Sequence, residues 1–218
     1  MQVKIISYSR PFGVEIGDKP DDIIAYTARV SNPSNQHNHE TAPRLLRYLA
    51  KHEHWSPFEM ASLCLEINTT RDIARQILRH RSFSFQEFSQ RYAEVSDLYS
   101  ERECRLQDET NRQSSIASTD EFLNGWWEDI QGHVAEYALS AYRYAVRQGI
   151  AKEQARALLP EGLTPSRMYM HGTVRSWMHY IKVRTHESTQ KEHRMIAEEC
   201  KKCLLEIYPS LREFFDES

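Results

Sequence analysis

The sequence predicts an α+β fold in a single domain that covers residues 1–218. Strand-like alternation of apolar and polar side chains occurs mostly in the first half of the chain, whereas the longest stretches of helical periodicity occur in the second half. This order differs from the regular strand–helix alternation of a doubly wound sheet. The chain also lacks an internal repeat. We therefore expect an antiparallel or mixed sheet flanked by long helices.

The first elements follow from local patterns. Residues 3–9 (VKIISYS) predict a strand, and residues 19–31 predict a short helix with Pro20 near its start and two acids in its first turn. After a polar loop, helical periodicity returns over about residues 40–52. Residues 61–70 alternate as a half-buried strand does.

A helix with a clear start comes next. Thr69 or Thr70 can cap it, and Asp72 suits the positive end of the helix dipole. Its apolar residues lie on one face over residues 71–80. The aromatic-rich stretch over residues 82–92 has a period of two, which predicts an extended segment.

The second half is mainly helical. Residues 96–118 are polar and predict a loop, after which a long helix runs from about Ser118 to Gln148 and stops at Gly149. A short helix, an extended segment and two further helices are expected over residues 151–159, 166–172, 174–184 and 189–207.

Composition argues against several classes of protein. Apolar residues make up 40% and charged residues 27%, unlike a disordered chain. No apolar run approaches the length of about 18 residues that a membrane helix needs, and the start lacks the basic flank of a signal peptide. Four cysteines are too few for a disulfide scaffold, so a cytoplasmic protein is expected.

Arginine dominates the basic residues. The chain has 20 Arg and 8 Lys, a net charge of −3, and 7 Gly without a G-x-G-x-x-G or G-K-[ST] loop. Arg presents a planar fork that suits phosphate and carboxylate groups. If this protein binds a nucleotide, side chains must hold the phosphates.

The densest set of polar residues begins on the helix over 71–80. Arg71, Arg75 and Arg79 are four residues apart and share one face, with Gln76 beside Arg79. A solvated basic face is the simpler interpretation. The aromatic residues that follow favour partial burial, and buried arginines normally need an anionic partner.

The extended segment can bring further groups to the same place. Glu87, Ser89 and Arg91 fall on one side of such a segment because its side chains alternate. We therefore expect Arg79, Glu87, Ser89 and Arg91 to converge. Two guanidiniums and a hydroxyl suit a phosphate monoester, and the carboxylate can orient an arginine or a sugar.

Residues 79–92 (RHRSFSFQEFSQRY) resemble the signature of the flavin-dependent thymidylate synthases, in which Arg-His-Arg is followed seven residues later by Ser. Arg79, His80, Arg81 and Ser89 stand at these spacings, and the usual Ser-x-Arg-Tyr ending is present. Residues 96–124 show no such match. The resemblance continues in the stretches 27–31, 54–60, 75–81, 156–160, 174–184 and 189–199.

The resemblance implies an enzyme that converts dUMP to dTMP with methylenetetrahydrofolate as carbon donor. NADPH would reduce a bound FAD, which would supply the hydride. The resemblance also implies a homotetramer whose active sites are shared between subunits. The dUMP residues implied are Gln76, Arg79, Glu87, Ser89, Gln90, Arg91, Arg156 and Arg184. The FAD residues implied are Ser31, His54, Ser56, Arg79, His80, Arg81, Glu87, Thr173, Arg175 and His179. Family members often carry Asn at positions 173 and 179, and sometimes His where this chain has Ser188.

The residues fit a mechanism without a thiol. One route to an electron-rich uracil C5 adds a cysteine to C6, but none of Cys64, Cys104, Cys200 and Cys203 lies in the arginine cluster. The resemblance makes Arg184 the catalytic residue, which would stabilise negative charge on uracil N3 and its carbonyl oxygen. Ser89 lacks an evident base and is assigned to phosphate binding.

Other readings remain open at this point. A nucleic-acid-binding module could use the arginine helix and its aromatic neighbours, although the acidic net charge argues against it. An inactive relative that binds only nucleotide is a third possibility. The pairs His37/His39 and His52/His54 are weak metal candidates, so no metal is expected. Core or interface packing is the main alternative to cofactor stacking for Trp126, Trp127, Tyr169, Trp177 and Tyr180.

Overall fold

A four-stranded sheet forms the centre of the molecule. The computed structural model describes residues 2–98 and 101–216, and its sheet has the order β1-β2-β6-β3 with every neighbouring pair antiparallel. The strands are β1 (Gln2–Tyr8), β2 (Ser62–Thr70), β3 (Ser84–Glu87) and β6 (Pro165–Thr173). The sheet confirms the α+β prediction, and of the two predicted arrangements it is the antiparallel one.

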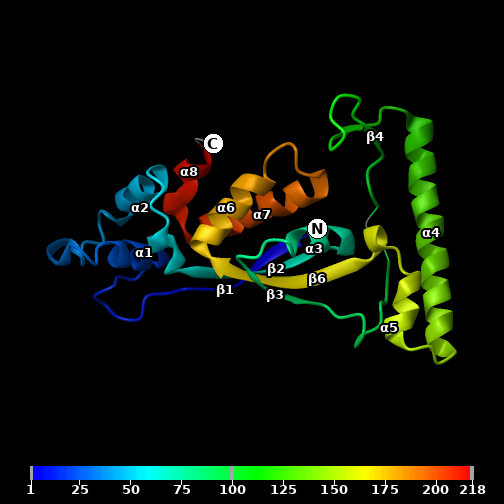
Figure 1. The fold of residues 1–218 in the computed structure, drawn as a ribbon, viewed down its shortest axis with the longest axis horizontal. Helices are drawn as coiled ribbons and strands as arrows, with labels where there is room; N and C mark the ends of the chain where they lie inside the picture. Colours follow the sequence, from blue (N-terminus) through cyan, green and yellow to red (C-terminus); the bar gives the residue numbers. More distant parts are fainter. Residues whose placement is uncertain (1, 99–100, 217–218) are drawn as a thin grey trace.

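Helices cover one face of this sheet (Figure 1). Along β6, Ser166, Met168, Met170 and Gly172 are buried, while the residues between them are more exposed. Gly172 allows a close approach, because a Cβ atom there would lie 2.4 Å from the ring of Phe83. The alternation predicted from sequence therefore selects the face that packs against the helices.

The helices around the sheet lie close to their predicted positions. They are α1 (Pro20–Ala28), α2 (Ala42–Lys51), α3 (Arg71–Ile77), α6 (Val174–Arg184) and α7 (Lys191–Ile207), while a short further helix, α8 (Arg212–Asp216), was not predicted. Short 3-10 turns connect them at Pro33–Asn35 (η1), Ser56–Glu59 (η2), Arg156–Leu158 (η3), Glu161–Leu163 (η4) and Pro209–Leu211 (η5). No helix in the described ranges combines the length and hydropathy needed to span a bilayer.

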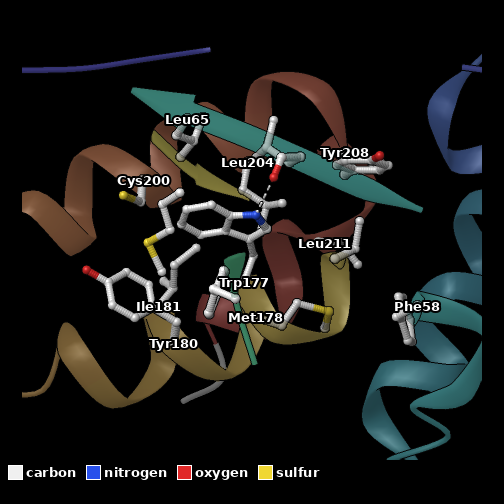
Figure 2. Close-up of a cluster of buried hydrophobic side chains, with 14 of the residues drawn as sticks. Phe58, Leu65, Trp177, Met178, Tyr180, Ile181, Cys200, Leu204, Tyr208 and Leu211 are labelled. Atoms are coloured by element: carbon white, nitrogen blue, oxygen red, sulfur yellow. Dashed lines mark hydrogen bonds between the residues drawn. The ribbon is translucent and has the colours of Figure 1, made fainter. Parts of the chain in front are cut away.

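Trp177 lies at the centre of the main core (Figure 2). Its ring is fully buried among side chains of α6, α7 and β2, and its indole Nε1 donates to the carbonyl oxygen of Leu63 at 2.9 Å. Tyr180 is also buried, with 1% of its surface exposed. Of the two interpretations left open for these rings, core packing is therefore the one observed.

The longest helix stands apart from the sheet (Figure 1). Helix α4 (Glu121–Arg147) is capped by Asp120, whose carboxylate accepts a hydrogen bond from the amide of Leu123 at 3.0 Å. It packs with α5 (Lys152–Ala155) and residues near Leu98 in a second, smaller cluster. The expectation that long helices flank the sheet thus holds for α6 and α7 but not for α4.

The local predictions for residues 96–118 and 71–80 differ from the structure. The polar segment 96–118, predicted as a loop, contains a hairpin of β4 (Arg105–Gln107) and β5 (Ser115–Ala117). Each strand has only three residues, too few for a periodic signal. The helix predicted over 71–80 ends at Ile77, so Arg79 lies in the turn that follows.

Candidate active site

Arg184 and His80 form the first polar contact of the site. Arg184 is the last residue of α6, and His80 follows α3, more than a hundred positions earlier. The Nε atom of Arg184 donates to Nε2 of His80 at 2.9 Å. Burial, and then the charge of Arg184, lower the pKa of His80 to about 4. The imidazole is therefore neutral near pH 7 and can accept this hydrogen bond.

Gln76 lies in the last turn of α3 and faces the start of α7. Its carboxamide nitrogen donates to Oε1 of Gln190 at 2.8 Å, and its oxygen lies 3.2 Å from Nδ1 of His193. His193 in turn lies 3.1 Å from the hydroxyl of Tyr180. These contacts place a predicted dUMP residue in a hydrogen-bonded network with three partners.

Glu87 ends β3 beside the start of α3. Its carboxylate accepts a hydrogen bond from the hydroxyl of Ser166 at 2.6 Å, and a guanidinium nitrogen of Arg71 lies 3.6 Å away. Arg79 is exposed and lies beyond the other end of the helix. Within one chain, Glu87 thus contacts Arg71 and not Arg79. The expected convergence fails because β3 runs back along α3 towards its start.

Ser89 and Arg91 lie in a turn and not on an extended strand. The amides of Tyr92 and Ala93 both donate to the carbonyl oxygen of Ser89, so the alternation of β3 ends before this point. Gln90, between them, is 3% exposed, and its Nε2 has no hydrogen-bond partner among the described residues. A buried donor without a partner is costly and suits a site that binds a polar ligand.

Glu153 brings two predicted dUMP residues together. Its carboxylate lies 3.5 Å from Nε of Arg91, and its carbonyl oxygen accepts from Nε of Arg156 at 3.2 Å. Both arginines belong to the predicted dUMP set, although they are 65 positions apart in the sequence. This group lies near α5, at the end of the molecule that carries α4 (Figure 1).

Some of the residues predicted for the flavin lie beside Trp55 or next to it in sequence. Its ring centroid is 4.5 Å from that of His179, and His54 and Ser56 are its neighbours in sequence. Arg175 donates to Glu59, while its Nε atom is buried without a partner in the part of the chain that the structure describes. Burial and the charges of Arg175 and Lys182 lower the pKa of His179, and Glu53 opposes them.

The other predicted flavin residues have separate positions. Thr173 caps α6 by accepting from the amide of Ser176 at 3.2 Å. Ser31 is exposed in the turn after α1, and Arg81 is exposed before β3. Ser188 accepts or donates a 2.8 Å hydrogen bond with Nδ1 of His186.

A cavity of about 530 Å³ opens beside His179, between α2, α6 and α8. Trp55, Tyr48 and Phe214 contribute aromatic surface to it. Its lining carries more positive than negative groups: Arg44, Arg47, Lys51 and Lys182 against Glu53 and Glu213. Such a lining suits a ligand that has both a ring system and anionic groups.

The predicted site residues therefore fall into separate groups in one chain. Arg175 and Arg184 mark two of the groups at opposite ends of α6, about 13 Å apart along the helix axis. Glu153 and its arginines mark another group, near α5. Within residues 2–98 and 101–216, no side-chain hydrogen bond or ion pair joins these groups.

The cysteines lie outside all of these groups. Burial raises the pKa of Cys64, Cys200 and Cys203, which disfavours the thiolate. Cys200 is fully buried in the main core and Cys64 lies on β2 opposite His171. None of these three thiols is activated as a nucleophile.

Sequence reasoning missed Gln190 and His193 as parts of the site. A signal for His193 was present, because it shares the apolar face of α7 with Ile196 and Cys200. A polar residue on a buried helix face requires a polar partner. That partner, Gln76, could not be identified from spacing because it lies 117 positions away.

A family model and two curated relatives point to one family. The family model described as thymidylate synthase complementing protein matches residues 14–210. A probable flavin-dependent thymidylate synthase of Paramecium bursaria Chlorella virus 1 is 46% identical over 216 residues, which are 99% of each chain. The flavin-dependent thymidylate synthase of Synechocystis sp. is 46% identical over 213 residues, 97% of each chain. A solved UMP/dUMP methylase, PolB from Streptomyces cacaoi bound with 5-Br dUMP, aligns with a TM-score of 0.83 at 26% identity, covering 99% of this chain and 94% of that one.

Proposed function

Because this chain belongs to the thymidylate synthase complementing proteins, the flavin-dependent thymidylate synthases, we propose that it methylates dUMP to dTMP with methylenetetrahydrofolate, FAD and NADPH. The contact between Arg184 and His80 carries this proposal. It joins the second residue of the family signature to the arginine that the family resemblance makes catalytic. Two separate segments that resemble the family, residues 79–92 and 174–184, are thus in contact.

The contact of Arg184 with His80 supports a role for this arginine in activating uracil. Its Nε is held by His80, so the two terminal nitrogens remain for a ligand. A guanidinium fixed in this way can stabilise negative charge that develops on uracil N3 and the adjacent carbonyl oxygen. Because His80 stays neutral, it adds no second positive charge that would repel Arg184.

The group around Glu153 supports phosphate binding. Arg91 and Arg156 both contact Glu153, and a phosphate bound to Arg91 would replace the Glu153 carboxylate there. Gln90, whose buried side-chain nitrogen Nε2 has no partner among the described residues, and Ser89, which carries a hydroxyl, precede Arg91 in sequence. We assign these residues to the phosphate and sugar of dUMP, with Arg79 and Glu87 completing the set.

The residues around Trp55 suit the binding of a flavin. The partnerless buried Nε of Arg175 and the cationic cavity beside His179 suit a ligand with rings and a pyrophosphate. His54, Ser56, Thr173 and Arg175 would hold the cofactor, and bound flavin supplies the hydride that completes the methyl group. Ser31, His80 and Arg81 are assigned to the same cofactor by family resemblance.

We propose a homotetramer, because one chain does not bring the predicted residues into a single site. Arg175 and Arg184 belong to groups at opposite ends of α6, so groups from different subunits would have to complement one another. Helix α4 supports this with an exposed apolar face. That face carries Phe122, Trp126, Val134, Tyr137 and Tyr144, beside the buried face that carries Gln131, Ala138, Tyr142 and Ala145.

The proposal is tested first by the visible spectrum of the purified protein. Bound oxidised flavin absorbs at about 450 nm, and NADPH should bleach this band. Addition of dUMP and methylenetetrahydrofolate should then yield dTMP and restore the band. A colourless protein that forms no dTMP when FAD is supplied would contradict the proposal. UMP serves as a second substrate in the same assay, since the similar structure PolB is described as a UMP/dUMP methylase.

We propose that no cysteine acts as the nucleophile. The raised thiol pKa values of Cys64, Cys200 and Cys203 support this, because a thiol with a raised pKa forms little thiolate. A variant with alanine at all four cysteines should retain most turnover per bound flavin. Loss of turnover in a folded, flavin-loaded variant would contradict the thiol-free route.

A further inference from the structure

A series of hydrogen bonds, all donated in the same direction, passes through the side chain of Gln76. The hydroxyl of Tyr180 lies 3.1 Å from Nε2 of His193, and Nδ1 of His193 lies 3.2 Å from the carboxamide oxygen of Gln76. The Gln76 nitrogen donates to Gln190 at 2.8 Å, and the Gln190 nitrogen donates to Glu192 at 2.9 Å. Every residue between the two ends donates one hydrogen bond and accepts one.

The carboxylate at the end of this series sets its direction. Glu192 is 6% exposed and lies 2.5 Å from a guanidinium nitrogen of Arg105 and 3.2 Å from one of Arg102. An ionised carboxylate only accepts hydrogen bonds, so Gln190 must turn its nitrogen towards it. Its oxygen then faces Gln76, which must offer its own nitrogen. The Gln76 oxygen is left facing His193.

These contacts also determine the tautomer of His193. The Gln76 oxygen can only accept, so Nδ1 carries the proton and Nε2 accepts from the Tyr180 hydroxyl. This arrangement requires a neutral ring. His193 is fully buried, and burial, followed by the charges of Arg184 and His80, lowers its pKa to about 3. The ring therefore stays a donor to Gln76 over the whole physiological range of pH.

We propose that His193 is a positioning residue that fixes the carboxamide of Gln76 for binding of dUMP. This rests on the proposed function, which places Gln76 at the substrate. With one amide hydrogen bound to Gln190 and one oxygen lone pair bound to His193, the carboxamide cannot flip, and its second hydrogen points in one direction. A glutamine held in this way loses less conformational entropy when it contacts a ligand.

The test compares two substitutions of one residue in the full-length, flavin-loaded protein. His193→Phe keeps the ring volume and removes both hydrogen bonds. His193→Asn places an amide nitrogen where Nδ1 was and keeps the donor to Gln76. We expect His193→Phe to weaken dUMP binding by about 5- to 10-fold, the effect of one hydrogen bond. His193→Asn should recover most of that loss.

A double-mutant cycle with Gln76→Ala separates positioning from general destabilisation. If His193 acts through Gln76, adding His193→Phe to Gln76→Ala should change dUMP affinity by less than 2-fold. Losses that multiply in the double variant would overturn the proposal, as would equal affinities of the Phe and Asn variants. Ile196→Val is the matched control on the same buried face of α7, and it should leave dUMP affinity unchanged.

Tyr180→Phe provides a test that leaves the core volume intact. It removes only the hydroxyl that donates to Nε2 of His193. We expect a 2- to 4-fold loss of dUMP affinity. This loss should be absent when Gln76 has been replaced by alanine. Unchanged affinity in this variant would count against the proposal even if the His193 variants fail to fold. Binding of dUMP by the unaltered protein tests the proposed function separately, because that measurement does not depend on His193.

Discussion

At the scale of single residues, hydrogen bonds at one end of a side chain decide what its other end can do. His80 binds Nε of Arg184 and thereby leaves the two terminal nitrogens of the guanidinium for a ligand. Lysine at this position would have one ammonium group for both tasks. The contact therefore gives a physical reason for arginine at position 184.

Arg184→Lys should slow methylation of dUMP by about 100-fold or more, the scale for removing one fixed donor to a developing charge. Reduction of the bound flavin by NADPH should change much less, because it does not require activated uracil. Single-turnover measurements of the two half-reactions separate these steps. Arg194→Lys, which replaces an arginine that binds the carbonyl oxygen of Glu187, is the control. Equal slowing of both half-reactions would show that Arg184 is structural or faces the flavin.

Arg91→Ala should weaken dUMP binding by about 2–4 kcal/mol, the scale of losing a desolvated charge pair. Binding of deoxyuridine, which has no phosphate, should stay nearly unchanged. Calorimetric titration with both ligands measures the difference, and Arg147→Ala at the end of α4 controls for a general loss of positive charge. The phosphate assignment is wrong if both ligands lose affinity equally.

At the scale of elements, α4 has more apolar surface than its own chain covers. Tyr137 is 79% exposed and Phe122 is 86% exposed on the face that points away from the smaller core cluster. A 27-residue helix that contacts its own chain along one side is typical of an element that packs against another subunit.

Tyr137→Glu should weaken subunit association, because it places a charge within the apolar face of α4. Sedimentation velocity should show a shift from the proposed tetramer to smaller species, with turnover falling in parallel since the proposed site is shared. Glu128→Lys reverses an exposed charge on the same helix outside this face and is the control. A Tyr137→Glu protein that sediments as the unaltered one does would contradict an α4 interface.

At the scale of the whole molecule, buried neutral histidines link stability to pH. The pKa is about 4 for His80 and about 3 for His193, against an ordinary value of 6.5. Below pH 6.5 the unfolded chain takes up protons that the folded chain does not. Stability is therefore present above pH 6.5 and is lost as the pH falls towards 4.

The free energy of unfolding should fall between pH 6.5 and 5 by up to about 1.4 kcal/mol per pH unit for each of these histidines. Urea unfolding at pH 7, 6 and 5 measures this slope. His193→Phe removes one titrating group and should flatten it, even though the variant is less stable at pH 7. A slope that is the same in both proteins would mean that His193 is protonated in the folded state.

The family was predictable from sequence because its signature depends on short, fixed spacings. The signature from Arg79 to Tyr92, the strand and helix periodicities and the lack of a thiol in the arginine cluster are all local. Hairpin β4–β5 and the turn at Ser89 were not predictable in the same way. In a three-residue strand or a single turn, tertiary contacts outweigh local preference.

The sequence by itself determined the α+β class, most element positions, the family, and therefore the residue types available for chemistry. The tertiary structure alone decided which of those residues meet. Glu87 joined Arg71 and not Arg79 because of the direction in which β3 runs, and Gln76 joined His193 across 117 positions because α7 packs beside α3. Such contacts depend on how buried faces fit together, and no spacing along the chain encodes the distance between two faces.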